Sequence, residues 1–294
     1  MSSANWNPPD LRGTVAVVTG ASRGAGRAIA AVLGETGATV YVTGRSVRGG
    51  ATTEGLPGTI QETAEEVSRR GGVGVAVRCD HTVDADVERL VARVRREHWH
   101  LDLLVNNAWG GYEAHDPTAF TAPFWMQPRT RWEAMFTAGV RAHLVMFQLA
   151  APLFLGRSER GRPGLVASTI AWAFGEPLGN LFYDVAKAAI VRMAYVAAEE
   201  LRPYRVAAVA IAPGFMRTER VLAAHAARPF DLSATESPEY VGRALAALAG
   251  DPEIMRRSGQ VLTAGDLARE YGFTDVDGRQ PAAFRITQAR QESH

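Results

Sequence analysis

The sequence has 294 residues, a formal net charge of +1 and 47% hydrophobic residues. This length and apolar content are enough to bury the core of one large α/β domain. We therefore expect a single domain over residues 1–294, with its core at about 13–265 and a tail at 266–294. A near-neutral charge without a basic stripe argues against nucleic acid as a partner.

The cellular location follows from three features. The first ten residues lack the basic start and the apolar segment of a secretion signal. The single cysteine, Cys79, excludes an internal disulfide and fits a reducing compartment. The most apolar expected helix, residues 143–155, is too short to span a bilayer and is interpreted as buried core. We expect a cytoplasmic protein with no membrane partner.

A β-branched run at residues 14–18 is typical of a strand buried on both faces of a sheet. The segment TGASRGAG, residues 19–26, follows it and leads into a helix with apolar residues at helical spacing. Glycines let the backbone approach a pyrophosphate, and the amides at a helix N-terminus stabilise the anion. An ordinary strand–helix turn is the alternative for this pattern alone. The dinucleotide contacts expected in the turn are Gly20, Ser22, Arg23, Gly24, Ala25 and Gly26.

The second expected strand, residues 39–43, ends in Gly44 and Arg45. A dinucleotide fold that selects NAD usually places an acid here for the adenine ribose hydroxyls, whereas a basic residue suits the additional phosphate of NADP. Arg45 therefore favours NADP(H), and Arg23 in the glycine turn adds a second positive charge. The alternative is a surface arginine that only solvates a loop.

Two further strand ends carry polar residues. Asp80 and His81 follow the third expected strand, residues 73–78. Asp80 is placed either to accept a hydrogen bond from the adenine amine or to cap the following helix. The fourth strand, residues 101–105, ends in NNAWGG. The alternation of strands and helices predicts a parallel sheet with right-handed crossovers and a ligand at the carboxyl ends of its strands.

These motifs, together with YDVAK at residues 183–187, resemble the short-chain dehydrogenase/reductase superfamily, whose TG-x-x-x-G-x-G, NNA and Y-x-x-x-K elements occur here in order. Residues 139–143 and 258–279 resemble more particularly the branch called dehydrogenase/reductase SDR family member 1. The resemblance implies a single Rossmann-type, doubly wound α/β domain with a seven-stranded, mostly parallel sheet and helices on both faces. It also implies a homodimer or homotetramer.

Tyr183 and Lys187 are four residues apart, so they share one face of a helix. A phenol with a pKa of about 10 is a poor acid–base catalyst at neutral pH. An ammonium at about 4 Å would attract the phenolate by on the order of 4 kcal/mol and lower that pKa by up to about three units. The resemblance implies that Tyr183 donates a proton to a carbonyl oxygen and that Lys187 also binds the nicotinamide ribose. A chance helix pair is the alternative.

The resemblance also implies the surroundings of the nicotinamide. The expected cofactor contacts are Asn107, Ala108, Trp109, Pro213, Gly214 and Thr218, besides Tyr183 and Lys187. Trp109 stands where the family usually has glycine. Residues 215–230 would form a mobile substrate lid. The expected substrate walls are Trp109, Trp172 and Phe215, which indicates an apolar or aromatic ligand.

Two positions depart from the family pattern. Alignment without gaps puts Ile170 or Ala171 where the family carries a hydroxyl that holds the substrate carbonyl. A longer loop after the fifth strand would place Thr169, or else Ser168, at this position, and both hydroxyls could equally be satisfied by the backbone. The family's helix asparagine, which supports a proton relay through water, is replaced by Gly139.

The sequence thus predicts an NADPH-dependent carbonyl reductase that transfers hydride to a C=O or related C=X group of a small, mostly apolar substrate. Reduction of an iminium or enone is one alternative, and a dinucleotide-binding protein with little catalysis is another. No metal site is expected, because His98 and His100 lack a third ligand at zinc-site spacing.

Overall fold

The computed structural model describes residues 6–112, 122–155, 161–171, 177 and 180–285. Its centre is a seven-stranded sheet in the order β3-β2-β1-β4-β5-β6-β7, in which all neighbouring strands are parallel. The strands are β1 (Val15–Val18), β2 (Thr39–Gly44), β3 (Val73–Arg78), β4 (Leu103–Asn106), β5 (Gly164–Thr169), β6 (Val206–Ala212) and β7 (Val261–Thr263). The doubly wound fold is confirmed, with a sheet that is parallel throughout. The strand order reverses between β1 and β4, which is where such sheets bind ligands.

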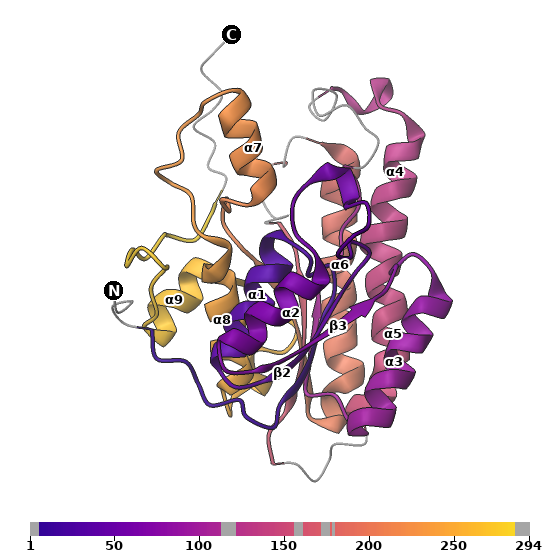
Figure 1. Cartoon of the computed structure of the whole chain (residues 1–294), viewed down its shortest axis with the longest axis vertical. Helices are drawn as coiled ribbons and strands as arrows, with labels where there is room; N and C mark the ends of the chain where they lie inside the picture. Colours follow the sequence, from indigo (N-terminus) through magenta and orange to yellow (C-terminus); the bar gives the residue numbers. More distant parts are fainter. Residues whose placement is uncertain (1–5, 113–121, 156–160, 172–176, 178–179, 286–294) are drawn as a thin grey trace.

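Helices cover both faces of this sheet (Figure 1). One face carries α1 (Gly24–Glu35), α2 (Ile60–Arg69), α8 (Pro238–Gly250) and α9 (Ala264–Tyr271). The other carries α3 (Asp84–His98), α5 (Ala142–Leu155) and α6 (Leu181–Leu201). The helix α7 (Glu219–Ala227) follows β6 and lies beyond the end of the sheet, at the top of the view.

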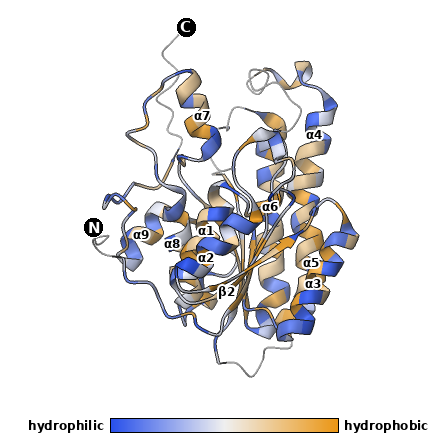
Figure 2. Ribbon diagram, in the orientation of Figure 1, coloured by the Kyte–Doolittle hydropathy of each residue, from blue (hydrophilic) through white to orange (hydrophobic). Residues whose placement is uncertain are grey.

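The strand β1 explains how the sequence divides between the two layers. Val15 and Val17 pack into the apolar cluster of α3, α5 and α6, whereas Ala16 and Val18 pack with α1 and α8. Successive side chains of a strand point to opposite faces, so a strand covered on both sides is apolar at every position. Figure 2 shows hydrophobic residues in the strands and hydrophilic residues on the outer sides of α2 and α3, whereas α5 is hydrophobic along most of its length.

The helix that contains α5 is longer than expected. It runs without a break from Arg129 to Leu155 through α4 (Arg129–Met135), a π-helical segment (Phe136–Arg141) and α5. Among the described helices it is the one long and apolar enough to cross a membrane by length and composition, a test that core helices of soluble proteins also pass. Buried side chains of α5, such as Met146 and Phe154, pack in the core beside β4 and β5. Single π-helical turns are frequent at functional sites, and this one carries Gly139.

Candidate active site

The glycine turn between β1 and α1 forms a seat for an anion. Gly20 and Gly24 have φ of +63° and +56°, which favours glycine. A Cβ on Gly20 would lie 2.8 Å from Ala108 Cα, and one on Gly26 would lie 2.4 Å from the Gly20 carbonyl oxygen. The Gly24 N–H donates to the Glu219 carboxylate at 2.9 Å. This carboxylate stands in for the dinucleotide phosphate that a helix N-terminus of this kind binds, so the residues present fit such a cofactor.

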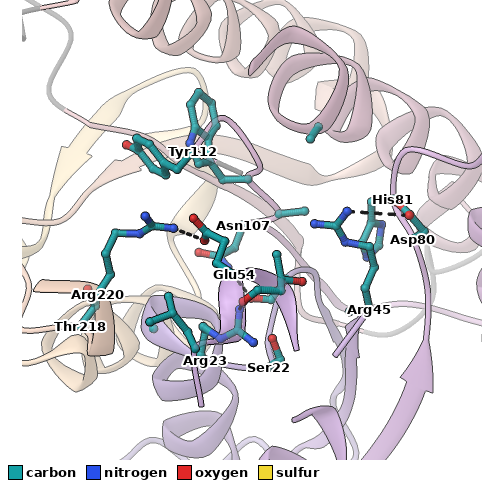
Figure 3. Close-up of a pocket in the computed structure, with 18 of the residues that line it drawn as sticks. Ser22, Arg23, Arg45, Glu54, Asp80, His81, Asn107, Tyr112, Thr218 and Arg220 are labelled. Atoms are coloured by element: carbon teal, nitrogen blue, oxygen red, sulfur yellow. Dashed lines mark hydrogen bonds and ion pairs between the residues drawn. The ribbon is translucent and has the colours of Figure 1, made fainter. Parts of the chain in front are cut away.

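A cavity of about 250 Å³ lies at the carboxyl ends of β1 to β4, with the start of α7 on its border (Figure 3). The predicted cofactor residues that line it are Gly20, Ser22, Arg23, Gly24, Arg45, Asp80, His81, Asn107, Ala108, Trp109 and Thr218. The lining does not include Ala25, Gly26, Tyr183, Lys187, Pro213 or Gly214. Four strand ends that the sequence singled out separately therefore meet at one cavity.

Arg45 and Asp80 face each other across one end of this cavity, with 4.0 Å between Nη1 and Oδ2 (Figure 3). Asp80 Oδ1 also accepts hydrogen bonds from the backbone N–H (3.0 Å) and the hydroxyl (2.7 Å) of Thr82. Burial raises the pKa of Asp80, but the Thr82 hydrogen bonds and the charge of Arg45 outweigh it, so the net pKa is lowered and the group is ionised. The N-cap of α3 is Val83, so the interpretation of Asp80 as the helix cap is wrong.

Arg23 holds the loop between β2 and α2 against the glycine turn. Its guanidinium donates to the carbonyl oxygens of Thr53 (3.0 Å) and Pro57 (3.1 Å) and to Ser46 Oγ (2.9 Å). Arg23 also lines the cavity, so its positive charge lies at the border of the cofactor site. Arg23 therefore combines a structural role with the charge expected of it.

Asn107 fastens β4 to the glycine turn. Its side-chain Nδ2 donates to the carbonyl oxygens of Thr19 (3.0 Å) and Gly20 (3.1 Å), and its backbone N–H donates to Thr19 Oγ1 (2.8 Å).

His81 lines the cavity after β3, with Nε2 at 2.8 Å from Thr43 Oγ1 of β2. Burial lowers the pKa of His81 to about 4, so this histidine is neutral at physiological pH.

Lys187 lies on α6, buried at 7% exposure, under the indole of Trp109. Its Nζ is 3.8 Å from the Trp109 ring centroid and 5.5 Å from the Tyr183 ring centroid. Burial lowers the pKa of Lys187 to about 7. The nearest described aromatic face to the amine is therefore the indole, at a distance typical of a cation–π contact.

Tyr183 is one turn earlier on α6, whose N-cap, Asn180, accepts hydrogen bonds from the backbone N–H groups of Phe182 and Tyr183 at 3.0 and 3.1 Å. Burial, together with a hydrogen bond to the hydroxyl of Tyr112, raises the pKa of Tyr183 above its usual range. The expected lowering by Lys187 is thus wrong for this geometry. Loss of hydration at a buried phenol outweighs the attraction of a buried amine that is itself discharged near neutral pH.

Trp109 and Gly139 are in contact, and the large side chain of one fills the space left by the missing side chain of the other. The indole packs on the π-helical segment, and a Cβ on Gly139 would lie 2.5 Å from Trp109 Cζ3 and 2.7 Å from Cε3. Both positions depart from the family pattern. The two departures are linked in space, because the indole ring fills the space that a side chain at residue 139 would need. The ring is also edge-on to Tyr183, with 5.3 Å between centroids.

The two candidate hydroxyls belong to the last two residues of β5 and differ in their surroundings. Thr169 Oγ1 donates to Asn107 Oδ1 at 3.2 Å and lies 3.4 Å from the Asn106 carbonyl oxygen. Ser168 is fully buried, and its hydroxyl has no hydrogen-bond partner among the described residues. The Ser168 hydroxyl does not open onto the cavity, and its role at a substrate carbonyl stays a prediction. The alternative of a hydroxyl satisfied by the backbone holds for Thr169 only in its longer contact, because its shorter bond is to a side chain.

The remaining predicted residues lie around the lid. The Gly214 N–H donates to Glu236 Oε1 at 2.9 Å, and a Cβ on Gly214 would lie 2.6 Å from Glu236 Oε2. Thr218 is the N-cap of α7, and its hydroxyl accepts from the Val221 N–H. Phe215 is 44% exposed and stacks on Phe230 with 6.0 Å between ring centroids. Trp172, the third expected substrate wall, lies outside the described residues.

Sequence reasoning did not single out several residues of the cavity, among them Glu54, Tyr112, Glu219 and Arg220. Arg220 forms an ion pair with Glu54, and its Cζ is 4.7 Å from the Tyr112 ring centroid (Figure 3). The lid is therefore joined to the loop after β2 across the cavity mouth. The sequence offered a signal for three of them. Tyr112 comes directly after NNAWGG, and Glu219 and Arg220 come directly after the PG-x-x-x-T element.

Comparison with known proteins agrees with this geometry. A family model described as short chain dehydrogenase matches residues 14–228. The chain is 38% identical over 281 residues to dehydrogenase/reductase SDR family member 1 of Mus musculus, covering 92% of this chain and 85% of that protein. The Homo sapiens protein of the same name is 37% identical with the same coverage. A short-chain dehydrogenase from Mycobacterium thermoresistibile has a similar crystal structure, with a TM-score of 0.77, 25% identity and coverage of 93% of this chain and 95% of that one.

Proposed function

Because the chain belongs to the short-chain dehydrogenase family, we propose that it is an NADP(H)-dependent oxidoreductase that reduces a carbonyl or related C=X group of a small, mostly apolar substrate. The observation that carries this proposal is the position of Tyr183 and Lys187 against the rings of Trp109 and Tyr112, which border the cavity at the anion seat. Aromatic walls favour an apolar ligand.

The side chains of the site suit the reductive direction. When bound, the reduced nicotinamide supplies the hydride. Tyr183 keeps its hydroxyl proton throughout the neutral range because its pKa is raised. A carbonyl oxygen becomes a much stronger base as its carbon accepts hydride, so the phenol can give up its proton at that stage. Lys187, with a pKa of about 7, carries an exchangeable proton near neutral pH.

The test of this proposal is NADPH oxidation over a panel of ketones and aldehydes. Tyr183→Phe should lose turnover by a factor of about 10³, since the general acid is removed while the ring stays. Tyr204→Phe, at a phenol that is 48% exposed, is the matched control and should retain wild-type rates. Equal rates for wild type and Tyr183→Phe would exclude Tyr183 as the acid.

The choice of NADP(H) over NAD(H) rests on Arg45. Its guanidinium lines the cavity at the end of β2, beside Asp80, and a guanidinium at this place can bind a phosphate dianion through charge-assisted hydrogen bonds. Arg45→Asp should shift the ratio of kcat/KM values toward NADH. Arg48→Asp is the control, because Arg48 lies on the same loop as Arg45 but pairs with Glu65 of α2 and does not line the cavity. An unchanged ratio in Arg45→Asp would remove Arg45 from the phosphate site.

A second candidate reaction is reduction of an iminium or enone. It is favoured by the β5 hydroxyls, because Thr169 is bonded to Asn107 and Ser168 is fully buried, and neither bonds to Tyr183 in the described part of the chain. These substrates need less protonation of an oxygen, so Tyr183→Phe would retain most turnover on them. Tight NADPH binding without turnover on any substrate would instead indicate a dinucleotide-binding protein.

The outer faces of α5 and α6 support a homodimer or homotetramer. Between them lies an apolar groove of about 780 Å³, lined by Leu144, Phe147, Met193 and Val196 among others. Leu144 is 52% exposed in the single chain. Light scattering of wild type and Leu144→Glu tests this assembly, and a wild-type monomer would refute it.

A further inference from the structure

Tyr112 stands between the cavity and Tyr183. It follows the NNAWGG segment at the carboxyl end of β4 and lines the cavity, which Tyr183 does not. The two phenol rings are inclined by 32° with 6.4 Å between their centroids. A ligand in the cavity can therefore contact Tyr112, whose ring lies beside that of Tyr183.

The hydroxyls of these two tyrosines are hydrogen-bonded to each other. Each hydroxyl carries one donor and two acceptor sites, so in this pair one O–H donates to its neighbour and the other O–H is directed elsewhere. A carbonyl oxygen has two lone pairs and can accept from both hydroxyls at once. An oxygen placed between them would replace the phenol–phenol bond with two bonds to itself.

Tyr112 is also held from the side of the lid. The guanidinium of Arg220 lies over its ring at 4.7 Å, and Arg220 is anchored by its ion pair to Glu54. This fixes the ring from a second element besides its own loop. A donor that is already oriented stabilises developing charge without further reorganisation.

We propose that Tyr112 is the second hydroxyl of the active site, a catalytic residue that donates a hydrogen bond to the substrate oxygen and orients it toward Tyr183. This inference rests on the proposed function. As the carbonyl carbon accepts two electrons with the hydride of reduced nicotinamide, the C=O π bond becomes a lone pair on oxygen. The oxygen then takes the proton of Tyr183, which regains one from solvent. Tyr112 keeps its proton throughout.

The experiment compares Tyr112→Phe, Tyr183→Phe and the control Tyr204→Phe with NADPH and the carbonyl panel. Tyr112→Phe removes one oxygen and keeps the ring. We expect kcat to fall by about 10- to 100-fold, within the range found when one donor to a developing oxyanion is lost. The Kd of NADPH, measured by fluorescence titration, should stay within about twofold of wild type. With NADPH deuterated at the transferred position, the isotope effect on kcat should rise because hydride transfer becomes slower than product release.

The outcomes separate this inference from the function on which it rests. An inactive Tyr183→Phe beside a fully active Tyr112→Phe would overturn the role of Tyr112 and leave the proposed function standing. A Tyr112→Phe protein that loses affinity for NADPH in proportion to its activity would place Tyr112 on the cofactor and also overturn the inference. Wild-type rates in both variants, or a wild type without turnover on the panel, would refute the proposed function together with the inference.

Discussion

Replacing Gly139 by asparagine should destabilise the protein, and replacing Trp109 by glycine at the same time should relieve much of that loss. A Cβ on Gly139 would lie 2.5 Å from Trp109 Cζ3, well inside contact distance. Forcing atoms into a filled space typically costs about 1–3 kcal/mol. For a chain of this size that corresponds to a fall in Tm of roughly 2–12 °C.

Trp109→Gly alone should also destabilise, because it removes the packing on residue 139 and the cation–π contact with Lys187, which is worth about 0.5–2 kcal/mol. In the double variant the asparagine enters the space that the indole has left. The two changes should therefore be non-additive, with a coupling of about 1–3 kcal/mol in favour of the double variant.

The measurement is urea unfolding of wild type, both single variants and the double variant at pH 7, with Thr137→Asn as a control at an exposed position of the same π-helical segment. Thr137→Asn should stay within about 0.5 kcal/mol of wild type. Additive losses in the cycle, or an unperturbed Gly139→Asn, would refute the interpretation that the indole and residue 139 compete for one space.

Three further variants probe buried or bonded charges. Glu219→Gln keeps an acceptor for the Gly24 N–H but removes the negative charge at the α1 N-terminus, so the Kd of NADPH should fall by about 2- to 10-fold, and a weaker binder would contradict this. The pKa of Lys187 is 10.5 in the unfolded chain and about 7 in the folded protein, so the wild-type free energy of unfolding should rise as pH increases from 7 to 10.5. Lys187→Met should show no such rise. Its free energy of unfolding should exceed that of wild type most at or below pH 7, by up to about 5 kcal/mol. Equal pH dependence in both proteins would refute the lowered pKa of Lys187. The pKa of Glu236 is 4.5 in the unfolded chain and about 7 in the folded protein, so the free energy of unfolding should fall as pH rises from 4.5 to 7. Glu236→Gln should abolish this fall and be more stable than wild type by up to about 3 kcal/mol at pH 8. A steeper fall in the variant would argue against the raised pKa of Glu236.

The sequence was sufficient for the sheet and for the phosphate seat because both depend on local pattern. Alternation of β-branched strands with amphipathic helices predicts a parallel sheet. Gly20 and Gly26 are needed where backbone approaches backbone, and Gly24 is favoured by its positive φ. Strand bounds differ from the prediction by one or two residues, as at β4, which begins at Leu103 rather than at residue 101.

The sequence could not predict partners that only tertiary structure brings together. The ion pair of Arg220 with Glu54 joins residues separated by 166 positions, and no spacing rule links them. The motif count could not say whether Thr169 or Ser168 takes the family's hydroxyl position, because the burial of Ser168 depends on the layers packed on β5. Neither Trp109 nor Gly139 is interpretable alone, because each is explained by the volume of the other.

The pKa of Tyr183 bears on the direction of the proposed reaction. An ammonium at a few ångströms in an accessible site would lower it, but here both groups are buried, and each loses hydration in its charged form. The shift of Lys187 from 10.5 to about 7 corresponds to on the order of 5 kcal/mol against its charged state, more than the attraction of about 4 kcal/mol expected for the pair. The phenol consequently stays protonated at neutral pH. Under the proposed function, Tyr183 would hold this proton until hydride transfer makes the substrate oxygen basic, which suits reduction of a carbonyl.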